Sequence, residues 1–342
     1  MSLEFESLND IAEAMTVKGK GILAADESSP TCKKRFDSID VDSTEENRNI
    51  YRDMLFTTKR MEEFISGVIL FDETIRQSTI KDGVSFPEYL SGLGVIPGIK
   101  VDAGAKHLSG TDSEKITEGL DGLDGRLKDY YKMGARFAKW RAVITIGENE
   151  PSGTCIAANA HALARYASLC QENGIVPIVE PEILMDGDHT IEESFVVSEE
   201  VLHTVFYELY GQNVELEGIV LKPNMVLSGY DCDQKEDVEK VAELTVQVFK
   251  RCVPAAVPGI AFLSGGQSDE DATAHLNAMN QILGDSSPWN LTFSYGRALQ
   301  APALKAWAGK DENISDAQAA FYKRARLNSL ATKGDYSEDM ES

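Results

Sequence analysis

The amino-acid sequence predicts an α/β protein built as one (β/α)8 TIM barrel. Short apolar runs rich in β-branched residues recur eight times, and stretches with helical spacing separate them. No low-complexity linker divides the chain. A doubly wound open sheet is the rival fold, but the first run lacks the Gly-x-Gly-x-x-Gly turn that usually follows its first strand. We therefore expect residues 1–342 to form a single barrel domain.

The predicted strands follow one another along the whole chain. They are GILAAD (21–26), ISGVILFD (65–72), VIPGIKVD (95–102), FAKWRAVI (137–144), IVPIVEPEI (175–183), EGIVLKPNM (217–225), GIAFLSGG (259–266) and LTFSYGRAL (291–299). Between them, segments such as 155–172 and 237–250 place their apolar residues near one helical face. Both ends look like additions to the barrel: an amphipathic helix over residues 1–16 and a polar, mobile tail over about 331–342.

Composition narrows the classes of function. The chain has 33 basic and 56 acidic side chains, and its net charge of −23 argues against nucleic acid or an anionic membrane as the main partner. No apolar run approaches the roughly 18 residues of a membrane span, and the first residues do not resemble a secretion signal. Five scattered cysteines without a Cys-x-x-Cys pair favour reduced thiols over a disulfide framework or a zinc site. We expect a cytoplasmic protein.

Charged residues end six of the eight predicted strands, which is where barrel enzymes carry their chemistry. They are Asp26, Asp72, Lys100, Lys139 with Arg141, Glu180 with Glu182, and Lys222. One such residue alone would indicate a solvated charge at the rim, because burying an unpaired charge costs several kcal/mol. Their repetition, and the convergence of cations in an acidic protein, predicts a pocket for an anionic substrate.

Lys222 is the strongest candidate for covalent chemistry. It follows an apolar strand and precedes Pro223, which holds the chain extended. Desolvation and the neighbouring Lys139 are both expected to lower its pKa. A free amine there attacks a carbonyl and forms an iminium, which accepts electrons when an adjacent C–C bond breaks. The alternative is a lysine that extends from a strand end into solvent.

Three carboxylates are candidates for proton transfer. Glu180 and Glu182 lie on the same side of a strand if Pro181 permits regular geometry, so that one acts as acid and the other as base. The alternative is a pair of rim carboxylates neutralised by lysines. Asp26 either accepts a proton from a substrate hydroxyl or caps the following helix, and the spacing alone does not decide between these roles.

Glycine-rich stretches follow the last two predicted strands. LSGGQS and SYGRAL place backbone N–H groups at helix starts, where barrels commonly bind phosphate. Arg297 supplies paired donors to the same anion. Arg35 and Lys100 are placed to hold a second anion across the mouth of the pocket.

These residues resemble the class I fructose-bisphosphate aldolases, the Schiff-base, metal-independent type. The matching stretches are GKGILAADES (19–28), STEENR (43–48), PGIKVD (97–102), GARFAKWRAV (134–143), IVPIVEPEIL with DGDH (175–189), LKPNMV (221–226), FLSGGQS (262–268) and LTFSYGRALQ (291–300). The resemblance implies reversible cleavage of fructose 1,6-bisphosphate to dihydroxyacetone phosphate and glyceraldehyde 3-phosphate, in glycolysis and gluconeogenesis. It also implies a homotetramer and no cofactor.

The resemblance also implies roles for individual residues. Lys222 looks like the Schiff-base lysine, and Glu180 the proton acceptor and donor, with Glu182 as a supporting carboxylate. Asp26 is similar to the residue that handles the C4 hydroxyl proton, and Lys139 to the lysine that steers these transfers. The substrate and phosphate candidates are Ser264, Gly265, Gly266, Ser294, Gly296 and Arg297 for one phosphate, Ser28, Thr31, Arg35 and Lys100 for the other, and Arg141. Thr31 departs from the family, in which a serine is expected.

Other functions stay open at this stage. The five dispersed histidines (His107, His161, His189, His203 and His275) disfavour a zinc-dependent aldolase. Sedoheptulose 1,7-bisphosphate and fructose 1-phosphate are alternative substrates, and a scaffold that mainly binds a protein partner is an alternative class. Animal members of the family end in a catalytic tyrosine; since Tyr336 is not terminal, we expect Glu180 or the substrate phosphate to carry that proton.

Overall fold

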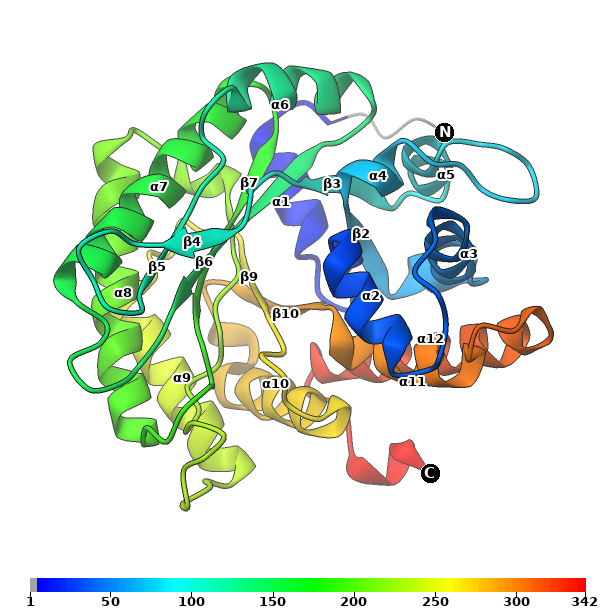
Figure 1. The fold of residues 1–342 in the computed structure, drawn as a ribbon. Helices are drawn as coiled ribbons and strands as arrows, with labels where there is room; N and C mark the ends of the chain where they lie inside the picture. Colours follow the sequence, from blue (N-terminus) through cyan, green and yellow to red (C-terminus); the bar gives the residue numbers. More distant parts are fainter. Residues whose placement is uncertain (1–4) are drawn as a thin grey trace.

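Eight parallel strands close into a barrel in the computed structural model, which describes residues 5–342 (Figure 1). The order around the barrel is β1-β10-β9-β8-β7-β6-β3-β2. The strands are β1 (Gly21–Ala24), β2 (Ile65–Leu70), β3 (Ile96–Lys100), β6 (Phe137–Ile144), β7 (Val176–Ile183), β8 (Val220–Leu221), β9 (Gly259–Phe262) and β10 (Asn290–Tyr295). The first strand pairs with the last, with Ile22 opposite Ser294. The predicted barrel is thereby confirmed.

Helices surround the barrel (Figure 1). They are α1 (Leu8–Met15), α2 (Ser29–Asp37), α3 (Glu45–Phe56), α4 (Asp72–Ile75), α5 (Phe86–Gly92), α6 (Leu123–Lys132), α7 (Gly153–Glu172), α8 (Ile191–Gly211), α9 (Val238–Cys252), α10 (Asp269–Leu283), α11 (Arg297–Trp307) and α12 (Ile314–Ala331). Four consecutive helices, α7 to α10, begin at a side chain that accepts a backbone N–H of the first turn: Ser152, Thr190, Asp237 and Ser268. Such caps fix where each helix starts after its strand.

The interior of the barrel is apolar at the end where the strands begin. Ile22, Phe137 and Val176 form one buried cluster there, and Ile11 and Met15 of α1 belong to it. The α1 helix therefore closes this end of the barrel, so that polar chemistry is left to the opposite end. Of the predicted helix over residues 1–16, residues 1–4 lie outside the described part of the chain.

Two local features differ from the predicted elements. A hairpin of β4 (Ala105–His107) and β5 (Lys115–Thr117) lies between β3 and α6 and was not predicted. The predicted strand over 217–225 contains only the two residues of β8, because Pro223 has no N–H to give to a neighbouring strand. A separate finding concerns membranes: each helix within residues 5–342 is too short or too polar to cross one.

The C-terminal segment has points of attachment. The Tyr336 backbone N–H donates to Asn277 Oδ1 at 2.9 Å, and the Tyr336 side chain is buried. Glu341 forms an ion pair with Arg324, which lies on α12. The predicted mobility of residues 331–342 stays a prediction, but the segment it concerns is bound to α10 and α12 at these contacts.

Candidate active site

The polar strand ends surround one pocket of about 260 Å³. All sixteen predicted site residues line it: Asp26, Ser28, Thr31, Arg35, Lys100, Lys139, Arg141, Glu180, Glu182, Lys222, Ser264, Gly265, Gly266, Ser294, Gly296 and Arg297. Asp72 follows the end of β2, as predicted, but it does not line this pocket. It begins α4, where its carboxylate pairs with Arg76 at 2.8 Å.

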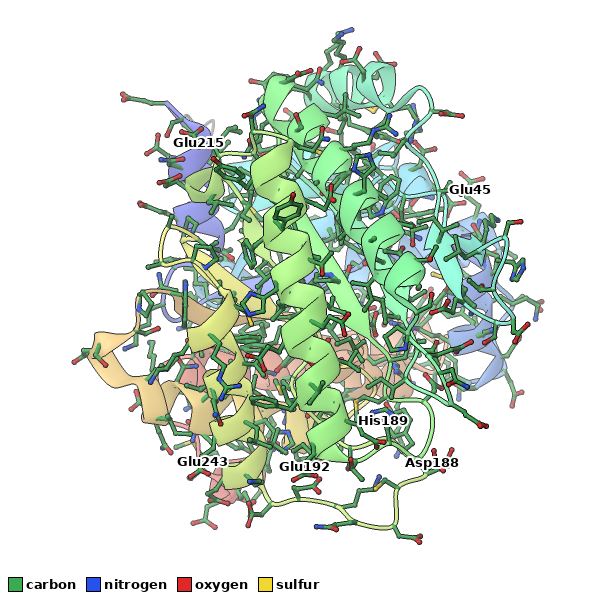
Figure 2. The ribbon with its side chains drawn as sticks, turned by 90° about the vertical axis from the view of Figure 1, so that its left-hand side faces the viewer. Glu45, Asp188, His189, Glu192, Glu215 and Glu243 are labelled. Carbon is green, nitrogen blue, oxygen red and sulfur yellow. The ribbon has the colours of Figure 1, made fainter. Side chains whose placement is uncertain are left out.

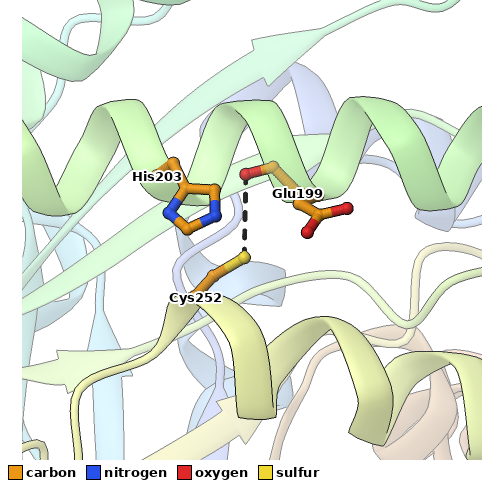
Figure 3. Close-up of side chains that lie close together, drawn as sticks. All are labelled: Glu199, His203 and Cys252. Carbon is orange, nitrogen blue, oxygen red and sulfur yellow. Dashed lines mark hydrogen bonds between the residues drawn. The ribbon is translucent and has the colours of Figure 1, made fainter.

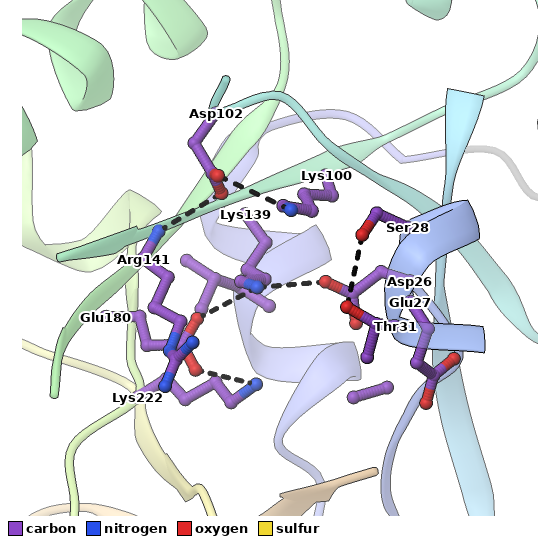
Figure 4. A network of polar contacts seen from close by, with 12 residues as sticks. Asp26, Glu27, Ser28, Thr31, Lys100, Asp102, Lys139, Arg141, Glu180 and Lys222 are labelled. Atoms are coloured by element: carbon purple, nitrogen blue, oxygen red, sulfur yellow. Dashed lines mark hydrogen bonds and ion pairs between the residues drawn. The ribbon is translucent and has the colours of Figure 1, made fainter. Parts of the chain in front are cut away.

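Two lysines and two carboxylates alternate at the bottom of the pocket (Figure 4). Lys222 Nζ lies 3.0 Å from Glu180 Oε1, and Lys139 Nζ lies 3.3 Å from Glu180 Oε2. Lys139 also donates to Asp26 Oδ2 at 2.9 Å. Lys222, Glu180 and Lys139 are each no more than 5% exposed. We expected the Lys139 ammonium group to repel that of Lys222. The Glu180 carboxylate lies between the two ammonium groups, so its negative charge reduces this repulsion.

The pKa shifts indicate which groups are ionised. Burial alone would raise the pKa of Asp26, but Lys139 and Lys222 outweigh it and hold that pKa well below its usual range. The same balance holds for Glu180: burial would raise its pKa, but Lys139, Lys222 and Arg141 outweigh burial and lower the pKa. Burial would lower the pKa of Lys139, but Asp26 and Glu180 raise it. At neutral pH both carboxylates are therefore proton acceptors, and Lys139 is a fixed cation.

The start of α2 decides between the two roles considered for Asp26. The cap of α2 is Ser28 rather than Asp26, and no helix N–H bonds to the Ser28 side chain. Asp26 therefore accepts from Lys139 instead of capping the helix. Ser28 Oγ and Thr31 Oγ1 lie 3.1 Å apart, and both residues line the pocket. Two hydroxyls thus face the place where we expect an anion.

Glu27 supports this edge of the pocket and was missed from the sequence. It is buried between Arg52, at 2.5 Å, and Arg35. Gln300 Nε2 donates to Glu27 Oε1 at 3.0 Å and to the Ala24 carbonyl at 2.6 Å. Burial raises the Glu27 pKa, but the two arginines outweigh it and the net pKa is lowered. The carboxylate therefore holds Arg35 in place at the edge of the pocket.

On the other side of the pocket the cations are paired as well. Arg141 contacts Glu182 through an ion pair, and the Arg141 backbone N–H donates to Asp102 Oδ2 at 3.4 Å. Lys100 Nζ lies 3.5 Å from Asp102 Oδ1. Asp102 was not among the predicted site residues, although it ends the third predicted strand. Glu182 directs its carboxylate at Arg141, and its supporting role stays a prediction.

The loop after β9 has the shape of an anion site. Gly265 and Gly266 have φ of +60° and +91°, which exposes successive backbone N–H groups. Ser294 is 1% exposed, and its Oγ has no hydrogen-bond partner among residues 5–342. Tyr230, which the sequence did not single out, donates its hydroxyl to the Gly265 carbonyl. The loop is therefore held in position and has a buried hydroxyl to offer to a ligand.

The close approach at Gly266 gives a testable prediction. A Cβ at this position would clash first with the Tyr230 hydroxyl and would also lie 2.6 Å from Arg297 Nη2, so Gly266→Ala displaces both side chains. We expect the dissociation constant of inorganic phosphate, measured by titration, to rise roughly 10- to 100-fold, about 1.4–2.8 kcal/mol. Gly110→Ala is the matched control, because Gly110 has φ of +90° and no atom of residues 5–342 within 4 Å of its Cβ position. Equal effects in both variants would show that backbone strain alone is responsible.

His275 braces the same loop from α10. Its Nδ1 lies 2.6 Å from Gln267 Oε1, and Gln267 Nε2 donates to the Ser264 carbonyl at 2.9 Å. Burial lowers the pKa of His275 to about 4, although Asp271 and Glu239 act in the opposite direction. The folded protein therefore keeps this imidazole neutral at a pH at which an exposed histidine is protonated.

We expect this histidine to contribute to acid destabilisation. The unfolded chain takes up the proton near pH 6.5 and the folded chain near pH 4, so the free energy of unfolding falls as the pH drops through this window. The full contribution is roughly 3 kcal/mol. Urea unfolding at pH 7 and pH 4 measures it, and the drop should be smaller in His275→Gln but unchanged in His107→Gln, which alters an exposed residue. Identical drops in all three proteins would contradict the assignment.

Comparisons with known proteins agree on one family. The family model "Glycolytic", described as fructose-bisphosphate aldolase class-I, matches residues 7–342. A probable fructose-bisphosphate aldolase class 1 of Xanthomonas campestris is 58% identical over 97% of this chain and 99% of its own. The cytosolic fructose-bisphosphate aldolase 4 of Arabidopsis thaliana is 56% identical over 94% of this chain and 82% of its own. The aldolase of Plasmodium falciparum, solved with TRAP and a small-molecule inhibitor, superposes with a TM-score of 0.95 at 51% identity and covers 98% of both chains.

Proposed function

This chain belongs to the class I fructose-bisphosphate aldolase family, which cleaves fructose 1,6-bisphosphate to dihydroxyacetone phosphate and glyceraldehyde 3-phosphate through a Schiff base, and we propose that Lys222 forms that Schiff base. One observation carries the proposal. The Lys222 amine is buried at the end of β8 with Glu180 Oε1 3.0 Å away, so a proton acceptor lies next to the amine that must lose a proton. Lys139 also lies near Glu180, at 3.3 Å, but it is paired with Asp26 as well, at 2.9 Å, whereas Glu180 is the one ion-pair partner of Lys222 among the described residues.

The same residues provide a path for each proton. Glu180 takes the proton from Lys222, which then adds to the C2 carbonyl of the ketose, and returns a proton when water leaves to form the iminium. Asp26 accepts the C4 hydroxyl proton while the C3–C4 bond breaks and its electrons move to the iminium, giving an enamine. Lys139 keeps Asp26 ionised for this step. After the aldehyde leaves, Asp26 releases its proton to the water that enters the pocket, and Glu180 takes up a proton from that water. Glu180 then supplies this proton to the enamine carbon, and hydrolysis releases the second triose phosphate.

Two groups of donors fit the two phosphates of the substrate. The first is the Ser264 to Gly266 loop with Ser294, Gly296 and Arg297, and the second is Ser28, Thr31, Arg35 and Lys100. The two groups meet at one edge, because Arg35 Nη2 lies 3.5 Å from the point that a Cβ would occupy if Gly296 carried one. With cations for both phosphates, we propose that the bisphosphate is preferred over fructose 1-phosphate, and a ratio of kcat/KM values near one would refute this preference.

Borohydride reduction tests the proposed lysine. Incubation with dihydroxyacetone phosphate and borohydride should fix the triose on the peptide that contains Lys222, as mapped by mass spectrometry. An adduct on another lysine, with Lys222 unmodified, would overturn the assignment. Cleavage at family rates without any adduct would instead overturn the Schiff-base mechanism while leaving the activity in place. Cleavage at family rates would also exclude the alternative that the protein is a scaffold without catalytic activity.

We further propose a homotetramer in the cytoplasm. Val196, Tyr207 and Tyr210 are 60%, 75% and 83% exposed, and their spacing places them on one face of α8. Figure 2 shows α8 on the side of the molecule that faces the viewer, with Glu192 labelled near its start. Large apolar side chains exposed along one helix favour contact with another subunit. Light scattering should give four times the chain mass of 37.5 kDa, and Tyr207→Glu should lower it. The cytoplasmic location that we propose is supported by the relatives whose names describe them as cytosolic. Cell fractionation tests this location.

A further inference from the structure

Two groups of polar side chains lie outside the strand-end pocket. Glu199, His203 and Cys252 lie close together where α8 meets α9 (Figure 3). Glu199 and His203 share the face of α8 that we assign to subunit contact, so the tetramer that we propose would cover this group. The second group lies behind the loop of residues 264–266, and its members bond to that loop.

The loop presents two backbone donors to the expected phosphate. They are the N–H groups of Gly265 and Gly266, and neither donates to another group of residues 5–342. A trans peptide bond is planar, so the N–H of each residue points opposite to the carbonyl of the residue before it. The direction of the Ser264 carbonyl therefore sets that of the Gly265 N–H. In the same way, the Gly265 carbonyl sets the direction of the Gly266 N–H.

Both of these carbonyl groups are held by side-chain donors. Tyr230, in the loop after β8, donates its hydroxyl to the Gly265 carbonyl. Gln267 Nε2 donates to the Ser264 carbonyl at 2.9 Å, and the Gln267 backbone N–H donates to the same oxygen at 3.0 Å. Two consecutive peptide planes of the loop are therefore fixed in orientation.

His275 in turn fixes the orientation of the Gln267 amide. Because the Ser264 carbonyl can only accept a hydrogen bond, the amide nitrogen of Gln267 faces it and Oε1 faces His275 Nδ1, 2.6 Å away. Nδ1 therefore carries a proton and donates it to Oε1. His275 is 6% exposed and lies on α10, so this donor is held by a rigid element.

Tyr230 is held in place through its own backbone. Its N–H donates to the Met185 carbonyl at 2.7 Å, and the N–H of Asp231 donates to the Gly187 carbonyl at 2.9 Å. These bonds join the loop after β8 to the loop after β7. Burial raises the pKa of Tyr230, although Arg297 acts in the opposite direction, so the hydroxyl keeps its proton and stays a donor.

The three side chains approach the loop from the side away from the substrate pocket. Tyr230, Gln267 and His275 line a separate cavity of about 770 Å³. Ser264 and Gly265 line the substrate pocket. Carbonyl groups that are held from the far side leave the opposite ends of their peptide planes, the N–H groups, directed at the pocket.

We propose that Tyr230 and the Gln267–His275 pair are positioning residues for this phosphate site. They direct the N–H groups of Gly265 and Gly266 at the anion and hold them there before it binds, which removes the cost of ordering the loop during binding. The inference rests on the proposed phosphate role of the loop and adds the residues that give the loop its shape. They act through the backbone rather than through charge, so no charge pattern in the sequence reveals them.

Amide signals of the loop test the inference in the full chain. The protein is labelled with 15N-glycine, and the signals of Gly265 and Gly266, identified by their loss in the two Gly→Ala variants, are followed by NMR as inorganic phosphate is added. These signals report this site separately from the second group of anion donors. We expect Tyr230→Phe and Gln267→Met each to raise the Kd at least about fivefold, because an N–H that is turned away loses part of a hydrogen bond to a charged group.

His275 provides a rescue experiment. His275→Leu should raise the Kd by a similar factor, whereas His275→Asn places an amide nitrogen near the position of Nδ1 and should stay within about twofold of the wild type. Equal weakening in both variants would mean that His275 acts through packing, and would overturn its positioning role. Tyr131→Phe removes an exposed hydroxyl of α6 and is the matched control for Tyr230→Phe, with an unchanged Kd expected. Thermal unfolding checks that each variant is folded.

The outcomes separate this inference from the phosphate assignment. An unchanged Kd in Tyr230→Phe and Gln267→Met, with both amide signals still shifted by phosphate, would overturn the inference and leave the loop as a phosphate site. Amide signals that do not respond to phosphate in the wild type would overturn the phosphate assignment itself, and the inference with it.

Discussion

Lys222→Met is expected to lower the turnover of fructose 1,6-bisphosphate by at least about 10⁴-fold, which is about 5.4 kcal/mol of barrier. Methionine has no amine to condense with the C2 carbonyl, so no iminium forms and the electrons of the C3–C4 bond have no acceptor. The fold should survive, because methionine is an unbranched side chain close to lysine in length and Glu180 keeps Lys139 as an ion-pair partner. Steady-state cleavage assays measure the loss, and thermal unfolding checks the fold.

A matched control distinguishes the loss of this amine from the loss of any positive charge. Lys240→Met removes an exposed lysine of α9 and should leave turnover within about twofold of the wild type, because its amine lies on the surface. If Lys222→Met retained a tenth or more of the activity in a folded protein, the Schiff-base role would have to move to another residue.

The second large effect is expected from Glu180→Gln, with a fall in kcat of about 10²- to 10⁴-fold. The amide keeps the size of the side chain but accepts no proton from Lys222, and it leaves the ammonium groups of Lys139 and Lys222 without the carboxylate between them. Both the dehydration of the adduct and the protonation of the enamine should slow. The rate of borohydride-trapped adduct formation measures the first step apart from overall turnover.

Glu182→Gln provides the comparison, because Glu182 lies two residues away and contacts Arg141 rather than the amine. Its effect should be much smaller and should appear mainly in KM, through a displaced Arg141. A larger fall in kcat for Glu182→Gln than for Glu180→Gln would mean that the two carboxylates have exchanged roles.

The fold was largely accessible from the sequence because each barrel strand is buried on both faces. Such strands read as short apolar runs, and a helix follows most of them, so the eightfold alternation is visible without tertiary information. The β4–β5 hairpin was missed because Ala105, Lys106 and His107 are all exposed and carry no apolar pattern. The length of β8 was overestimated because its apolar run continues past the point where pairing stops.

The site was predictable where a charge interrupts an apolar strand, as at Lys139, Glu180 and Lys222. It was not predictable where a residue acts through distant partners. Glu27 follows Asp26 directly, but its place between Arg52 and Arg35 depends on how α2 and α3 pack. Tyr230 lies in a polar loop whose position is fixed by the bond from its N–H to the Met185 carbonyl at 2.7 Å. Only the three-dimensional structure brings such partners together.

Closure of the barrel by β1 and β10 affects how the chain is made in the cell. The ribosome releases residues 21–24 early, but their partner strand begins at residue 290. At about 5–20 residues per second, one edge of the first strand stays without its partner for a time on the order of tens of seconds. During translation the nascent chain therefore carries a sheet edge with unpaired backbone groups, to which other chains or chaperones can bind. The complete ring of strands forms only near the end of synthesis.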